Sequence, residues 1–206
     1  MRDPATVYTK RGTPIILIVS RLLFGLYFAL LIFARAKGYL DGQALGISWL
    51  MYLAGILISA EYVYASFLKK NIDLTFAFPL LLAVYVLHGV SLLVRGQEQF
   101  PIINRAEHFT SFILMGYIVW VFFLKYLPQQ VWQRHPYYTA LLVLSITSLA
   151  GVMNEIIELF FDVTFHTKTI GGGFDTPLDL LMNTLGTGLF LAVQLILNTS
   201  APSDQA

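Results

Sequence analysis

The sequence predicts an all-α, polytopic integral membrane protein built as a bundle of six transmembrane helices. Of its 206 residues, 57% are hydrophobic and only 12% are charged, whereas an average soluble domain carries about 25% charged residues. Six apolar segments are each long enough to cross a bilayer, which takes about 20 residues in a helix. The connectors between them are short, so we expect one membrane domain over residues 15–197.

Composition also excludes several classes of function. The formal net charge is +1, so the chain offers no strongly basic surface for nucleic acid and no strongly acidic one. The absence of cysteine rules out disulfides, thiolate metal sites and cysteine nucleophiles. The chain contains neither a Gly-x-Ser-x-Gly nor a His-Glu-x-x-His motif, so hydrolases of those two types are unsupported.

The first predicted helix follows a polar, basic N-terminus of residues 1–14. Residues 15–34 are apolar over the length needed to span a bilayer. A signal peptide is the alternative, because Ala34-Arg35-Ala36 resembles a cleavage site. The apolar region is longer than the roughly 7 to 15 residues of a signal core and contains Arg21, which favours a retained helix.

Five further spans follow the first one. We place them near residues 47–68, 74–94, 107–127, 137–161 and 177–197. Glycine, proline and charged residues mark the connectors between them. Residues 198–206, a short polar run, are expected to form a disordered tail.

The distribution of basic residues predicts an orientation. Six spans place both termini on one side, and seven Lys and Arg residues lie there against five on the other side. This bias favours cytoplasmic termini of a protein in the cell (inner) membrane. The third and fifth connectors would then face outward.

Two consecutive apolar segments carry polar residues at helical spacing. On the first, steps of four, three and four place on one helix face Gly151, Glu155, Glu158 and Asp162. On the second, similar steps align Asp175, Asp179, Asn183 and Gly186. Because burying charge in hydrocarbon is costly without partners, the two polar stripes are expected to face each other at one end of a helical hairpin.

A third polar segment, Asn104-Arg105-Ala106-Glu107-His108, stands where the fourth predicted span begins. By alternation of the helices it lies on the same membrane side as the end of the fifth span and the start of the sixth. We therefore predict one polar, ligand-binding pocket near the outer boundary. Its candidate residues are Arg105, Glu107, His108, Glu155, Glu158, Asp175, Asp179 and Asn183.

A structural alternative exists for the start of the last span. Thr176 can act as N-cap, with Pro177 at the first helical position and Asp179 facing the free backbone amides. Such a cap can also belong to a binding site. Asp175, like Asp162, lies near water and can be an ordinary loop carboxylate.

The remaining members have alternatives of other kinds. Glu107 and His108 can sit in the head-group layer. Glu155 and Glu158 are flanked by large apolar residues, so they are functional or make a buried pairing that supports function. Asn183 lies a turn deeper than any cap and is expected to hydrogen-bond across helices.

Charged residues also occur in the first half of the chain. Glu61 lies well inside the second predicted span, and His88 lies near the end of the third. Either can join the pocket or pair with Arg21, and a buried polar contact is the simpler expectation.

The polar motifs resemble those of VanZ-like integral membrane proteins and their small, uncharacterised inner-membrane relatives. The resemblance covers roughly residues 104–190. It is carried by Asn104-Arg105-Ala106-Glu107-His108-Phe109, by Glu155-x-x-Glu158, and by Asp175-x-x-x-Asp179-x-x-x-Asn183-x-x-Gly186. VanZ-like sequences tend to have Gln where Glu158 stands, so glycopeptide resistance is not carried over.

The resemblance implies a bacterial or archaeal cell-envelope protein. It also implies a polar pocket formed by His108, Glu155, Glu158, Asp179 and Asn183.

Three functions fit these observations. The first is a binding or transport module whose outward-facing acidic pocket holds a cationic or amphiphilic ligand, such as a lipid head group. The second is a membrane scaffold whose polar residues only lock the helices together. The third is an enzyme acting on a lipid-linked phosphate held by Arg105. Its Mg²⁺, Mn²⁺ or Ca²⁺ ion would be held by His108, Glu155, Glu158 and Asp179.

Overall fold

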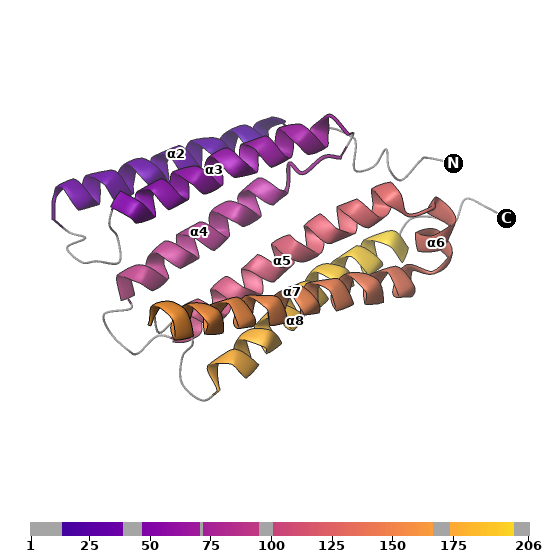
Figure 1. The fold of residues 1–206 in the computed structure, drawn as a ribbon. Helices are drawn as coiled ribbons and strands as arrows, with labels where there is room; N and C mark the ends of the chain where they lie inside the picture. Colours follow the sequence, from indigo (N-terminus) through magenta and orange to yellow (C-terminus); the bar gives the residue numbers. More distant parts are fainter. Residues whose placement is uncertain (1–13, 39–46, 71, 95–100, 167–173, 200–206) are drawn as a thin grey trace. The chain divides into compact units, whose positions relative to one another are not determined.

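The computed structural model describes residues 14–38, 47–70, 72–94, 101–166 and 174–199, and every regular element in these ranges is an α-helix (Figure 1). The chain divides into two compact units, Met1–Asn104 and Arg105–Ala206. Each unit is described by itself below. The predicted all-α class is confirmed for the described residues.

The first unit contains α2 (Pro14–Ala36), α3 (Ile47–Leu68) and α4 (Ala77–Val94). Helices α2 and α4 approach closely where Tyr27 crosses Gly89, because a Cβ at that glycine would overlap the tyrosine hydroxyl. The same hydroxyl donates a hydrogen bond to the carbonyl oxygen of Tyr85 at 3.0 Å. A Cβ at position 89 would therefore displace the Tyr27 hydroxyl from this hydrogen bond.

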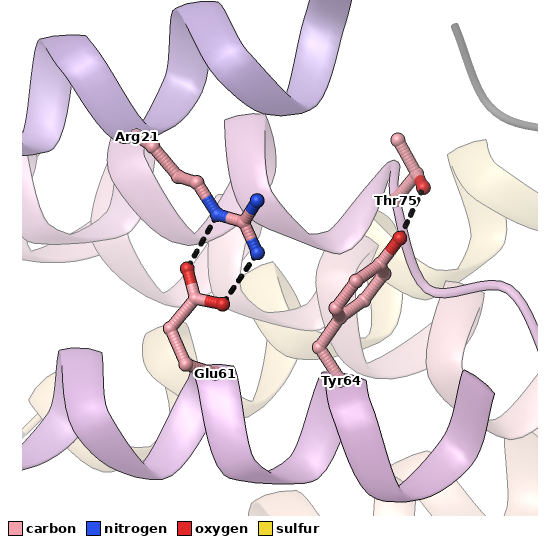
Figure 2. A network of polar contacts seen from close by, with 4 residues as sticks. All are labelled: Arg21, Glu61, Tyr64 and Thr75. Atoms are coloured by element: carbon pink, nitrogen blue, oxygen red, sulfur yellow. Dashed lines mark hydrogen bonds and ion pairs between the residues drawn. The ribbon is translucent and has the colours of Figure 1, made fainter. Parts of the chain in front are cut away.

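Polar contacts join α2 to α3 in this unit (Figure 2). Both carboxylate oxygens of Glu61 accept hydrogen bonds from the Arg21 guanidinium, at 2.6 and 2.5 Å. The guanidinium also lies 5.4 Å from the ring centre of Phe78, a distance typical of a cation–π contact. Beside this pair, the hydroxyls of Tyr64 and Thr75 are 3.3 Å apart. Glu61 thus pairs with Arg21, one of the two alternatives considered for it, but the contact is exposed and not buried as expected.

The second unit contains most of α5 (Pro101–Tyr126), together with α6 (Gln129–Arg134), α7 (Pro136–Phe165) and α8 (Asp175–Thr199). Helices α7 and α8 pack side by side, and the short α6 contacts α7 (Figure 1). The buried apolar side chains of the second unit include Phe112, Tyr117, Trp120, Val121, Val143, Phe190 and Leu191.

Helix α8 lies directly against α5. A Cβ at Gly186 would overlap the backbone carbonyl oxygen of Phe109, so only glycine permits this approach. One residue later, the Thr187 hydroxyl donates a hydrogen bond to the Phe112 carbonyl oxygen at 3.2 Å. Backbone contact at this point brings the N-terminal parts of both helices within side-chain reach of each other.

Four of the described helices are long and apolar enough to cross a membrane. The spans are Ile15–Ala36, Ile102–Tyr126, Pro136–Thr164 and Asp175–Leu197. Large apolar side chains are exposed along them, for example Leu22, Leu141 and Ile196, as expected where lipid tails cover the surface. The apolar stretches of α3 and α4, Leu53–Leu68 and Ala77–Val90, are shorter. A membrane protein is therefore supported, and crossing by α3 and α4 stays a prediction.

Several element boundaries differ from those expected from hydropathy. Helix α5 begins at Pro101, six residues before the predicted span near 107–127, because proline suits the first helical position, where no backbone N–H is needed. Helix α6 lies within a predicted connector. Helix α8 continues to Thr199, beyond the expected end at 197. The predicted N-terminal segment up to residue 13 and the tail from residue 200 lie outside the described residues.

Candidate functional site

The early start of α5 places Arg105 and His108 inside a helix, whereas the sequence suggested the end of a connector. Residues three and four positions apart lie on one helix face. Arg105, His108 and Phe112 therefore share a face, and Phe112 at the end of this run is buried. The helix thus directs His108 to the same side as a buried aromatic residue.

His108 contacts two residues of α8. Its Nδ1 atom is 3.1 Å from Oδ1 of Asn183, and its Nε2 atom is 3.7 Å from Oδ2 of Asp179. Asp179 and Asn183 are four residues apart, so their side chains project from consecutive turns toward one imidazole. Both side chains are buried, with 2% of each residue exposed. The predicted helix-crossing role of Asn183 is confirmed by this contact.

Glu155 enters the same region from α7. Its residue is 7% exposed, and within the described ranges its Oε1 atom has no hydrogen-bond partner. One ligand-type atom from each of His108, Glu155 and Asp179 lies within 4.8 Å of the others. Three helices therefore bring two carboxylates and one imidazole to a single buried point.

Gly151 makes room for this arrangement one turn before Glu155. A Cβ there would lie 3.0 Å from Nδ2 of Asn183 and 3.4 Å from the Phe112 ring. The glycine on the polar stripe of α7 therefore serves packing, since it lets the Asn183 amide lie against the helix.

The other predicted site residues surround this point. Asn154 donates a hydrogen bond from Nδ2 to Oε1 of Glu158 at 2.8 Å. A guanidinium nitrogen of Arg105 is 3.6 Å from Oδ1 of Asp175. Neither Glu158 nor Glu107 belongs to the three-residue group, as far as the described residues show. Both are half-buried, Glu107 on α5 and Glu158 on α7.

The start of α8 differs from the predicted cap. The helix begins at Asp175, two residues before Pro177, which was expected at the first helical position. Asp179 is consequently the fifth residue of the helix and not the third. Proline is still tolerated at position 177, because backbone N–H groups of the first turn have no partner within the helix.

Asn154 was not among the predicted site residues. Its signal was present in the sequence, because an amide four residues before a carboxylate on a helix can reach it. The roles of Gly151 and Gly186 as points of close approach had no such signal, since they depend on which helix lies opposite.

We define the polar cluster as Arg105, His108, Glu155, Glu158, Asp175, Asp179 and Asn183. It contains four carboxylates and one guanidinium, so its formal net charge is three negative charges when His108 is neutral. Carboxylate oxygens and an imidazole nitrogen are ligands for divalent metal ions. Carboxylates also accept hydrogen bonds from organic cations. The cluster is therefore suited to holding a positively charged group.

Comparison with known proteins identifies the family of the chain. No curated protein and no solved structure matches it. A family model described as "Predicted membrane protein (DUF2238)" matches residues 19–200, which include all six long helices almost completely. The chain therefore belongs to the DUF2238 family of predicted membrane proteins.

Proposed function

We propose that this protein is a membrane-embedded module that binds or transports a cationic ligand in the polar cluster. The observation that carries the proposal is the side chain of Glu155, which is 7% exposed while its Oε1 atom has no hydrogen-bond partner among the described residues. An ionised carboxylate in an apolar region is costly unless a positive charge or hydrogen-bond donor compensates it. A bound cation supplies that compensation.

The polar cluster contains one guanidinium, that of Arg105. One of its nitrogens lies 3.6 Å from Oδ1 of Asp175. One guanidinium against four carboxylates leaves formal negative charge in the cluster.

Two features of the sequence support an outward-facing cluster in the cell envelope. The count of seven against five Lys and Arg residues favours cytoplasmic termini, which puts the end of the bundle that carries the cluster outside. The resemblance of the polar motifs to VanZ-like proteins implies an envelope protein too. A ligand would then enter from outside, from the water phase or the head-group layer.

Binding of defined cations to the full-length protein in detergent micelles tests this proposal. We use Mn²⁺, Mg²⁺ and Ca²⁺ as metal probes and tetraphenylphosphonium as an amphiphilic probe. At least one of them should bind saturably, and Glu155→Gln should weaken that binding by roughly tenfold or more, as expected when a charged partner worth about 1.4 kcal/mol is removed.

A scaffold role predicts a different pattern. If the cluster only locks helices together, Glu155→Gln lowers the melting temperature and no probe binds to the wild-type protein. Saturable binding that is equally strong in the wild type and in Glu155→Gln would also contradict the proposal.

A further inference from the structure

We propose that the ligand is a single divalent metal ion, bound directly by Nε2 of His108 and by the carboxylates of Glu155 and Asp179, with Asn183 orienting the imidazole. This inference rests on the proposed function and names the chemical class of the cation. Each of the three ligands comes from a different helix of the second unit, α5, α7 and α8.

The distances between the three side chains suit a shared metal ion. Nε2 of His108 and Oδ2 of Asp179 are 3.7 Å apart, which is too far for a hydrogen bond. Two ligands held at about 2.1 Å from one ion stand about 3.0 Å apart when adjacent and about 4.2 Å apart when opposite. The separation of 3.7 Å falls between these limits. The full group lies within 4.8 Å, so its ligand atoms would move closer together to bind one ion.

The contact with Asn183 prepares His108 for metal binding. Oδ1 of an asparagine can only accept hydrogen bonds, so the contact at 3.1 Å is a hydrogen bond in the tautomer whose Nδ1 carries the proton. In the neutral imidazole the lone pair is then on Nε2. That atom faces Asp179, another acceptor, and a cation between them resolves the conflict. Metal-bound histidines commonly donate their second ring N–H in this way.

Glu155 provides an independent indication of a ligand. Its side chain is more than nine-tenths buried, and Oε1 lacks a hydrogen-bond donor within the part of the chain that the structure describes. A structural carboxylate at such a place would be expected to have a donor. Its inclusion in the three-residue group shows that the carboxylate reaches the same point as His108 and Asp179.

Charge balance favours a divalent ion over a monovalent one. The carboxylates of Glu155 and Asp179 carry two formal negative charges, which one divalent ion neutralises. A neutral complex is favoured where the dielectric constant is low, because any uncompensated charge there is costly. A monovalent cation would leave one negative charge buried.

The types of ligand indicate a first-row transition metal. Mg²⁺ and Ca²⁺ prefer sets made of oxygen alone, whereas imidazole is a good ligand for Mn²⁺, Fe²⁺ and Zn²⁺. Thiolates are absent from the chain. Mn²⁺ is the best probe of this set, because it accepts both imidazole and carboxylate and is visible by electron paramagnetic resonance.

Mn²⁺ binding to the purified full-length protein, first freed of metal with a chelator, tests the inference. We expect one Mn²⁺ per chain, and in pulsed electron paramagnetic resonance a ¹⁴N coupling from one directly bound imidazole. Glu155→Gln should weaken Mn²⁺ binding by roughly tenfold or more, and Asn183→Ala by roughly tenfold to a hundredfold, the usual effect of removing a residue that orients a ligand.

Glu61→Gln is the matched control. Glu61 is also a carboxylate on an apolar helix, but both of its oxygens accept hydrogen bonds from Arg21. This variant should bind Mn²⁺ like the wild type. His108→Ala should remove the ¹⁴N coupling. If that variant does not fold, the presence or absence of the coupling in the wild type shows whether an imidazole binds the ion.

The possible results separate this inference from the proposed function. If tetraphenylphosphonium binds in a Glu155-dependent manner while Mn²⁺ does not bind stoichiometrically, the metal site is wrong and the cation-binding function stands. If none of the probes binds, both are wrong. Stoichiometric Mn²⁺ binding without ¹⁴N coupling would overturn the role of His108 as a ligand.

Discussion

The two units of the chain each place charged side chains on apolar helices, and they do so in opposite ways. In the first unit, Arg21 and Glu61 form a complete pair with two hydrogen bonds (Figure 2). Their side chains are 40% and 36% exposed. In the second unit, Glu155 and Asp179 are buried beside a single imidazole. Whether a carboxylate on an apolar helix makes a structural contact or belongs to a binding site can therefore be judged only when its interaction partner is known.

The difference lies in charge balance and in unused hydrogen-bonding capacity. A guanidinium and a carboxylate in fork-like contact satisfy each other, so the pair of the first unit has little left to offer a ligand. The polar cluster has more acceptors than donors. We expect the Arg21–Glu61 pair to hold α2 against α3. We expect the polar cluster to bind a ligand.

We expect the largest effect from a substitution that prevents the close approach of α8 to α5. Gly186→Ala places a Cβ against the backbone carbonyl oxygen of Phe109, and backbone cannot move aside easily. We expect a loss of about 3 kcal/mol in the free energy of unfolding, at the upper end for overpacking, and weaker Mn²⁺ binding because α8 is pushed from α5.

Gly188→Ala is the control for this prediction, because a Cβ there meets nothing within 4 Å among the described residues. It should be neutral or slightly stabilising, since alanine favours helix more than glycine does. Equal melting temperatures for both variants would show that α5 and α8 are not in close contact.

The next effect concerns the pair of the first unit. Glu61→Gln leaves the Arg21 guanidinium uncompensated on an apolar helix and should lower the free energy of unfolding by roughly 2 kcal/mol, less than the cost at a fully buried position because both side chains are partly exposed. Thermal unfolding in detergent micelles measures the change.

A double-mutant cycle sharpens this result. Arg21→Gln combined with Glu61→Gln should recover part of the lost stability, because no isolated charge remains. Strictly additive losses would mean that the two side chains do not interact.

In the polar cluster the same substitution should act with the opposite sign. Glu155→Gln removes an uncompensated buried carboxylate, so the metal-free protein should gain about 1 kcal/mol of stability. The additional stabilisation that Mn²⁺ gives the wild type should disappear, since ligands stabilise only the state that binds them. Melting curves with and without Mn²⁺ measure both effects, and a large loss in the metal-free protein would contradict the comparison.

The smallest effect concerns the hydrogen bond that joins α8 to α5 below the cluster. Thr187→Val keeps the shape of the side chain but removes its bond to the Phe112 carbonyl oxygen. We expect a loss of about 1 kcal/mol in the free energy of unfolding. Thr184→Val is the control, because that hydroxyl bonds within its own helix, to the Leu180 carbonyl oxygen, and its loss should cost less.

Much of the fold follows from local properties of the sequence. Long apolar runs with few charges predict helices that cross a membrane, and all six predicted spans coincide with helices. Their ends were less predictable. Proline marks connectors but also begins helices, as Pro101 does in α5. The six-residue α6 is too short to produce a hydropathy signal.

Helical spacing by itself determined which side chains share a face. Steps of three and four residues were enough to align Glu155 with Gly151, and Asp179 with Asn183, because each helix has a fixed rotation per residue. The spacing also indicated that these faces are polar and in need of partners.

Only the tertiary structure decided which of those partners meet. It joined His108 to Asn183 and Asp179, and it matched Glu61 with Arg21. The physical reason is that periodicity sets the direction of a side chain around one axis, whereas the distance between axes depends on packing. At Gly186 that distance depends on a missing Cβ, and the contacts of the polar cluster depend on the close approach that it allows.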